Sequence, residues 1–157
     1  MNADDLKLLQ ASLAAGLPLS ARWVIDETPW DWDFSLAQQE LQPASEADIS
    51  GGDLPPEWLE LYLFGSQDYS EGGGARPFVG IHKDTGAVYG LDVERDSECL
   101  YFLNSSVPCF IETYWIFFEI LGEGTGSRHG LPARVRAADP EGFDQSEWKD
   151  LANELGL

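Results

Sequence analysis

Two aspartates flank a tryptophan at Asp31-Trp32-Asp33, a spacing that holds a divalent metal ion in some enzymes. Hard cations prefer carboxylate oxygens as ligands, so this pair is the first candidate for chemistry. However, the aspartates alternate with Trp30, Trp32 and Phe34, and an alternation of period two is typical of a strand with one aromatic and one acidic face. We therefore expect carboxylates in water on one face of a strand, and no metal site.

The same segment also has the composition of a protein-binding anchor. Tryptophan is enriched at binding hot spots as well as in cores, and carboxylates around it would suit a basic target. If Trp30 and Trp32 are instead core residues, replacing them with alanine would prevent folding rather than weaken partner binding alone. The predicted partner-binding residues are Asp26, Glu27, Trp30, Asp31, Trp32 and Asp33.

Other residues that could do chemistry lack the spacing of a known motif. The two histidines, His82 and His129, lie in no recognisable arrangement with a serine or cysteine nucleophile. The run of glycines at 72–74 is not followed by the Lys-Ser/Thr pair of a phosphate-binding loop. Cys99 and Cys109 form no CxxC pair, and reduced cysteines suit a cytoplasmic protein. We therefore predict no catalytic residue, no cofactor and no metal.

The charge balance favours a basic partner. The chain carries 9 basic and 28 acidic residues, a formal net charge of -19, which repels nucleic acid and anionic membranes. Residues 1–64 hold 2 basic and 12 acidic residues, residues 65–124 hold 3 and 10, and residues 125–157 hold 4 and 6. This field would speed the encounter with a basic protein, although acidity can also serve solubility alone. It opposes self-association, so we expect a monomer.

The sequence predicts neither export nor a membrane span. Asp4 and Asp5 stand where a secretory signal would carry basic residues followed by an apolar run. The longest apolar stretch, residues 110–121, is interrupted by two glutamates and a threonine and is too short to cross a bilayer. We expect a cytoplasmic protein without a membrane partner.

Three segments have the apolar periodicity of helices. The first has Gly16 just past its end, the second follows a potential cap at residues 104–106, and the third starts at the capping-box pattern Asp144-x-x-Glu147. Their apolar positions are Leu6, Leu9 and Leu13; Phe110, Tyr114, Phe117, Phe118 and Leu121; and Trp148, Leu151 and Leu155.

Four short runs between these helices have the composition of strands: residues 58–64, 78–82, 87–93 and 99–103. The turn Asp84-Thr85-Gly86 joins the second to the third, because Asp can bond its own downstream backbone and Gly tolerates positive φ. Connections this short produce antiparallel neighbours. We therefore predict an α+β fold in which residues 1–157 form a single domain. It has a mainly antiparallel sheet and N-terminal, central and C-terminal helices.

Three stretches of the chain occur in an order that is more specific than any one of them. Leu61–Ser66 ends in Phe-Gly-Ser, Val79–Tyr89 is a hairpin whose Asp-x-Gly turn leads into Val-Tyr, and Tyr101–Ser106 ends in Asn-Ser-Ser before the aromatic helix. Together they resemble the fourth branch of the SUKH superfamily of bacterial immunity proteins, over roughly residues 54–155.

This resemblance implies a curved antiparallel sheet flanked by helices, in a protein of a polymorphic toxin system. Such a protein binds and occludes a cognate toxin, often a nuclease or deaminase, and has no catalytic residues. A basic toxin would suit the acidic field.

Two other functions stay open. A small-molecule or peptide-binding regulator on the same scaffold would need a deep apolar pocket with few polar groups. A carboxylate-dependent hydrolase would need two acids whose environments separate their pKa values, for example a buried carboxylate facing His82.

Overall fold

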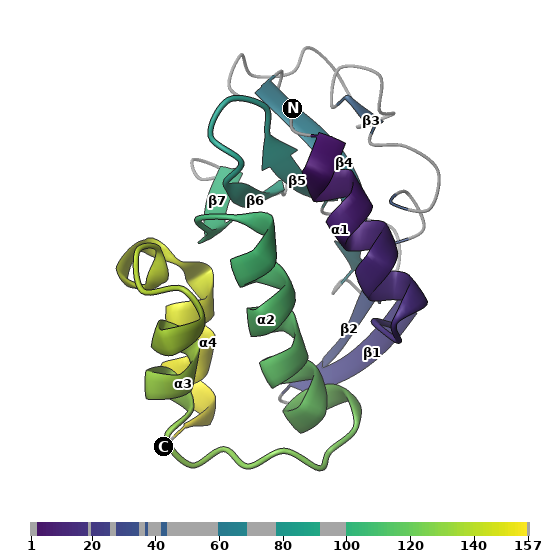
Figure 1. The fold of residues 1–157 in the computed structure, drawn as a ribbon. Coiled ribbons are helices and arrows are strands. Elements are labelled where there is room, and N and C mark those ends of the chain that lie inside the picture. Colours follow the sequence, from purple (N-terminus) through teal and green to yellow (C-terminus); the bar gives the residue numbers. More distant parts are fainter. Residues whose placement is uncertain are drawn as a thin grey trace.

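Helices cover one face of a curled sheet, and the central helix runs between the N-terminal and C-terminal ones (Figure 1). The computed structural model describes residues 3–18, 20–25, 28–34, 37, 42–43, 60–68, 78–91 and 100–156. Its helices are α1 (Ala3–Ala14), α2 (Val107–Phe117), the π-helical turn η4 (Phe118–Gly122), α3 (Leu131–Ala138), the 3-10 turn η5 (Phe143–Gln145) and α4 (Glu147–Leu155).

The sheet is antiparallel at every pairing of the described strands. The strands are β1 (Ser20–Ile25), β2 (Thr28–Asp33), β3 (Gln42–Pro43), β4 (Leu61–Asp68), β5 (Phe78–His82), β6 (Val88–Leu91) and β7 (Leu100–Asn104). Their order is β1-β2-β4-β5-β6-β7, and β3 also pairs with β4. The α+β class, the antiparallel sheet and its curvature are thus confirmed.

A close approach between β2 and β4 explains one glycine. A β-carbon added to Gly65 would lie 2.6 Å from Cδ1 of Phe34 and 2.8 Å from the carbonyl oxygen of Asp33. The register between β4 and β5 also shifts between Leu63 and Gly65, which marks a bulge. Gly65 therefore lets two strands that are distant in the sequence pack tightly, with Phe64 fully buried beside it.

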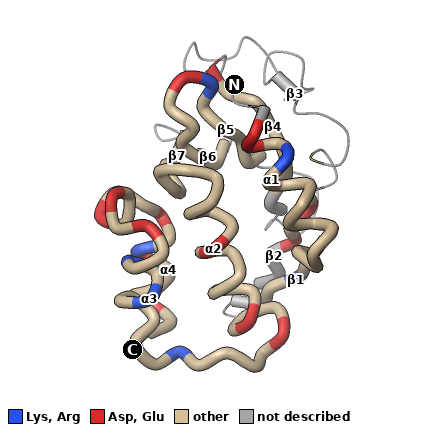
Figure 2. Tube along the Cα trace, in the orientation of Figure 1, with Lys and Arg blue, Asp and Glu red and all other residues tan. Residues whose placement is uncertain are grey.

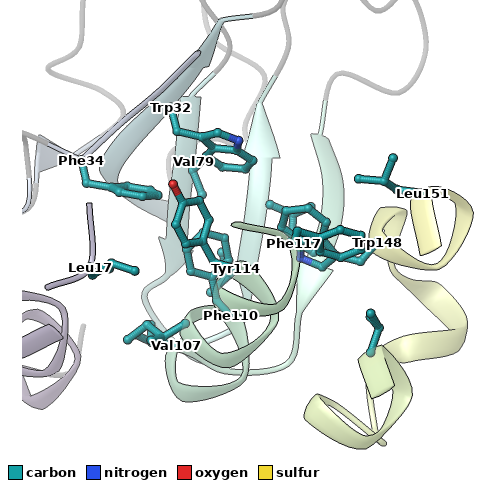
Figure 3. Packing of buried hydrophobic residues seen from close by; sticks show 14 of the residues in the cluster. Leu17, Trp32, Phe34, Val79, Val107, Phe110, Tyr114, Phe117, Trp148 and Leu151 are labelled. Atoms are coloured by element: carbon teal, nitrogen blue, oxygen red, sulfur yellow. The ribbon is translucent and has the colours of Figure 1, made fainter. Parts of the chain in front are cut away.

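The core lies between the helices and the sheet and is unusually aromatic. Tyr114 of α2 lies beneath Trp32 and Phe34, and the rings of Phe117 and Trp148 stack with centroids 4.9 Å apart (Figure 3). Such ring pairs add to the free energy gained from burial alone. The largest fully buried side chains are Trp23, Trp32, Tyr114, Phe34, Phe64, Phe110, Phe117, Leu9, Leu61, Leu63 and Ile81.

Local sequence explains where the helices begin and end. Ser106 caps α2, because its hydroxyl accepts a hydrogen bond from the amide of Cys109 at 3.3 Å. Gly16, at φ 116°, follows the end of α1. The turn between β5 and β6 places Gly86 at φ 77°, as the predicted hairpin requires.

Two expectations about the C-terminal region were wrong. The helix α3, which starts at Leu131 beside a proline in its first turn, was not expected from the sequence. The cap of the last helix was expected to be Asp144. The cap is Ser146, whose hydroxyl accepts from the amide of Trp148 at 3.0 Å. The carboxylate of Asp144 instead pairs with Arg136 at 3.0 Å.

Candidate functional site

The predicted partner-binding segment forms the second half of a hairpin between β1 and β2. Asp26 and Glu27 lie outside the described residues, and of Trp30 only the backbone is described, within β2. The side chains of Asp31 and Asp33 are half-buried. Alternation along β2 is therefore confirmed for its described side chains, since Trp32 points into the core between these two acids.

Trp32 does not match the expectation of a surface anchor. Its relative exposure is 1%, and its ring stacks on Trp148 at 5.9 Å and meets Tyr114 edge-on at 5.3 Å. A side chain enclosed in this way cannot contact a partner without opening the core. The physical reason is the size of the apolar ring, which gains more from burial on the inner face of the sheet than from a solvent position.

The carboxylate of Asp31 forms an ion pair with Arg22. It accepts two hydrogen bonds from Arg22 on the neighbouring strand, at 2.7 Å and 3.1 Å. This contact raises the pKa of the Arg22 guanidinium above its usual value, chiefly through the side-chain hydrogen bond. A basic partner would therefore have to compete with Arg22 for Asp31, which weakens the predicted surface at this position.

The structure brings together a histidine and two acids whose proximity the sequence did not predict. Ligand-type atoms of Glu60, His82 and Asp84 lie within 4.8 Å of one another beside the β5–β6 turn. However, Glu60 pairs with Lys83 at 2.9 Å, and the hydrogen bond from Lys83 lowers the pKa of the Glu60 carboxyl. Nδ1 of His82 accepts from the amides of Asp84 and Thr85 at 3.2 Å and 3.3 Å. These contacts give the group a structural role in the turn.

The amides that bond Nδ1 also fix the tautomer of His82. A neutral imidazole that accepts at Nδ1 carries its proton on Nε2, and a protonated Nε2 cannot bind a metal. The arrangement at His82 therefore does not favour a metal site. His129 is exposed, and the glycines at 72–74 lie outside the described residues.

A buried carboxylate is present at Asp139, which is 2% exposed. Its Oδ1 accepts from the hydroxyl of Ser105 at 2.6 Å and from the amide of Gly142 at 3.1 Å. Its Oδ2 accepts from the amide of Ser105 at 2.8 Å and from Nδ2 of Asn104 at 3.2 Å. Four donors saturate this carboxylate, so it resembles a structural anchor more than an acid or base poised for catalysis.

The same hydrogen bonds continue into two helices. Asn104 also donates to Oγ1 of Thr113 in α2 at 3.2 Å, and its Oδ1 accepts from Nε1 of Trp148 in α4 at 2.8 Å. Ser146 donates to the carbonyl of Leu103 at 2.5 Å. The network therefore fastens the last strand of the sheet to α2, α4 and the segment after α3. We call this set the Asp139 network; its residues are Asn104, Ser105, Thr113, Asp139, Gly142 and Trp148.

Acidic and basic residues are unevenly distributed over the described elements (Figure 2). Basic positions occur on α3, on α4 and in the segment before α3, whereas α2 and the turn that follows it carry acidic positions alone. The acids of α2 and η4, Glu112 and Glu119, are exposed.

A comparison with protein-family models matches residues 2–154 to the SUKH-4 immunity protein family. The chain belongs to this family. Membership implies immunity to a toxin, since immunity proteins bind a cognate toxin. Comparisons with curated proteins and with solved structures found no match.

Residues in each of the three stretches that resemble SUKH-4 proteins form contacts within or beside the core. Phe64 and Gly65 close the contact between β2 and β4, and the hairpin residues form β5 and β6. Asn104 and Ser105 hold Asp139, and Ser106 caps α2. Capping therefore explains only one residue of the Asn-Ser-Ser run. No helix among the described residues is long and apolar enough to cross a membrane.

Proposed function

We propose that this chain neutralises one cognate toxin of a polymorphic toxin system by binding it directly and covering the surface with which the toxin acts. The observation that carries this proposal is the match to the SUKH-4 family over residues 2–154, because it spans almost the entire chain. The chain would act as a single unit in the cytoplasm, and its charge favours a monomer.

The proposed toxin is basic and acts on nucleic acid, as a nuclease or a deaminase. Support comes from the net charge of -19, because carboxylates can occupy a groove that a toxin uses for phosphates. Opposite charge also raises the rate of encounter between proteins, and rapid capture benefits a cell that makes the toxin itself.

The proposed mechanism is occlusion without catalysis by this chain. The two sets of side chains closest in type to a catalytic site, Asp139 and the Glu60–His82 pair, are engaged in structural contacts. Asp139 accepts four hydrogen bonds, while His82 and Glu60 are held by the turn amides and by Lys83. The donors to Asp139 belong to Asn104, Ser105 and Gly142, and the donors to Nδ1 of His82 are the turn amides, which supports a structural role for both side chains.

Co-expression with the product of the gene immediately upstream tests this proposal. We expect that product to arrest growth when expressed alone and growth to return when this chain is present. The two proteins should then co-purify in a fixed ratio. An unrelated acidic protein of similar size serves as the control for charge alone. Absence of both rescue and complex would contradict the proposal and favour the regulatory alternative.

A further inference from the structure

We propose that the toxin docks, through a surface that is basic and partly apolar, on the solvent-facing side of α2. This inference rests on the proposed function and identifies the face that performs it. We call this face the α2 stripe; its residues are Pro108, Cys109, Glu112, Trp115, Ile116 and Glu119.

Helix geometry brings most of these positions together. Successive residues of an α-helix are rotated by about 100°, so positions 108, 112, 115 and 116 of α2 fall on one side, and Glu119 follows them in η4. The burial pattern agrees: 108, 112 and 119 are exposed, while Trp115 and Ile116 flank them and are half-buried. The opposite side of α2 forms the core through Phe110, Tyr114 and Phe117. In Figure 1, α1 lies on one side of α2 and α3 on the other, with the sheet behind it.

The α2 stripe has the composition of a binding hot spot for a basic protein. Trp115 is half-buried, with its ring edge-on to Phe118 at 5.7 Å, and tryptophan is enriched at binding hot spots. Glu112 and Glu119 are both exposed and lie seven residues apart in the sequence, a rise of about 10 Å for helical residues. No ion pair in the described part of the chain involves either glutamate. No lysine or arginine occurs between Arg95 and Arg128 in the sequence. Unlike Asp31, neither carboxylate has an ion pair with a lysine or arginine among the described residues.

The end of the stripe coincides with an irregular turn. The chain changes from α-helix to π-helix at Phe118, and the amide of Glu123 donates to the carbonyl of Phe118 at 2.9 Å. A π-turn costs stability relative to a continued α-helix and is frequently found at functional sites. This turn contains Glu119, the last residue of the α2 stripe.

A second copy of this chain is a poor occupant of the same surface. Two chains of charge -19 repel each other, and the α2 stripe would oppose its own carboxylates across a symmetric interface. The occupant to which we commit is therefore the toxin, with lysine or arginine side chains facing Glu112 and Glu119.

Charge reversal on two faces tests this inference. The variant Glu112→Lys/Glu119→Lys changes the α2 stripe, and the control Glu141→Lys/Asp150→Lys makes the same change in net charge at exposed positions near α3 and α4. Each is compared with wild type for growth rescue from the upstream gene product and for the yield of the co-purified complex. We expect at least a tenfold loss for the first variant and less than a threefold loss for the control. The two variants should have similar melting temperatures, because their net charges are equal.

Cys109 offers a second readout that needs no variant, because it is a free, half-exposed cysteine within the α2 stripe. Alkylation of Cys109, followed by mass spectrometry of its peptide, should slow at least tenfold when the upstream product is bound. Equal losses for the two double variants, or unchanged alkylation of Cys109 in the complex, would overturn this inference while leaving the proposed function intact. Failure of the wild-type chain itself to bind would overturn the proposed function, and this inference with it.

Discussion

At the scale of single residues, two sets of buried polar atoms differ in how fully they are bonded. Asp139 accepts four hydrogen bonds, whereas the indole nitrogens of Trp23 and Trp32 and the hydroxyl of Tyr114 have no bonding partner in the described structure. Loss of a satisfied buried group leaves its partners unpaired, whereas loss of an unsatisfied one removes a cost. Substitutions at the two sets should therefore act in opposite directions.

The first prediction concerns Asp139→Asn. The variant keeps the shape of the side chain but replaces one oxygen by an NH₂ group, and each oxygen of Asp139 faces two donors. We expect the free energy of unfolding to fall by about 2–4 kcal/mol, measured by urea denaturation at neutral pH. Glu141→Gln removes a carboxylate that is exposed and should leave the curve unchanged. Equal curves for the two variants would mean that the Asp139 network adds no stability.

The second prediction concerns Tyr114→Phe. At neutral pH the variant should be as stable as wild type, within about 1 kcal/mol, or more stable, because the hydroxyl is buried without a partner. Burial also raises the pKa of Tyr114 above its ordinary value of 10.0. The unfolded chain therefore loses this proton first as the pH rises, so wild type should lose stability above about pH 10.

Comparing the two proteins at pH 7 and at pH 11 isolates this effect from that of the other tyrosines. The stability of the variant relative to wild type should be greater at pH 11. A variant less stable by more than about 1.5 kcal/mol at pH 7 would show instead that the hydroxyl is bonded, for example to a buried water.

At the scale of elements, the sequence was sufficient to predict a helix or turn where the residues that cause it are neighbours in the chain. Leucine spacing predicts α1, the Asp-x-Gly turn predicts the β5–β6 hairpin, and the potential cap at residues 104–106 predicts the start of α2. The sequence was insufficient to predict the burial of a side chain where its contacts come from residues far away in the chain. Asp139 lies more than thirty residues from Asn104, so its burial follows from contacts that no local pattern contains. Trp32 resembles an exposed anchor until the packing of Trp148 against it is known.

The third prediction compares two candidate caps of α4. Ser146→Ala removes the acceptor for the amide of Trp148 and the donor to the carbonyl of Leu103, so the free energy of unfolding should fall by about 1–3 kcal/mol. Asp144→Ala removes only an exposed ion pair with Arg136 and should leave the unfolding midpoint nearly unchanged. Thermal unfolding followed by circular dichroism measures both. A larger effect at Asp144 would restore the capping box that the sequence suggested.

At the scale of the whole molecule, one charge distribution has two consequences. The net charge of -19 opposes folding, because folding brings like charges closer together. The same charge favours association with a basic protein, because association brings opposite charges together. The sequence predicts this balance but not the face that presents it. The proposed face is that of α2, which carries an acidic residue and no lysine or arginine, while α3 and α4 carry most of the basic positions of the C-terminal region (Figure 2).

The last prediction is that salt acts in opposite directions on the free chain and on its complex. Raising NaCl from about 0.01 M to about 0.1 M shortens the Debye length from ~30 Å to ~10 Å. Screening of self-repulsion should then raise the melting temperature of the free chain, by about 2–5 °C. The same screening should lower the rate of association with the upstream gene product about tenfold. KCl should act as NaCl does, because screening depends on ionic strength. An association rate that does not change with salt would mean that the toxin is not basic where it binds, and that the acidity of this chain serves its solubility alone.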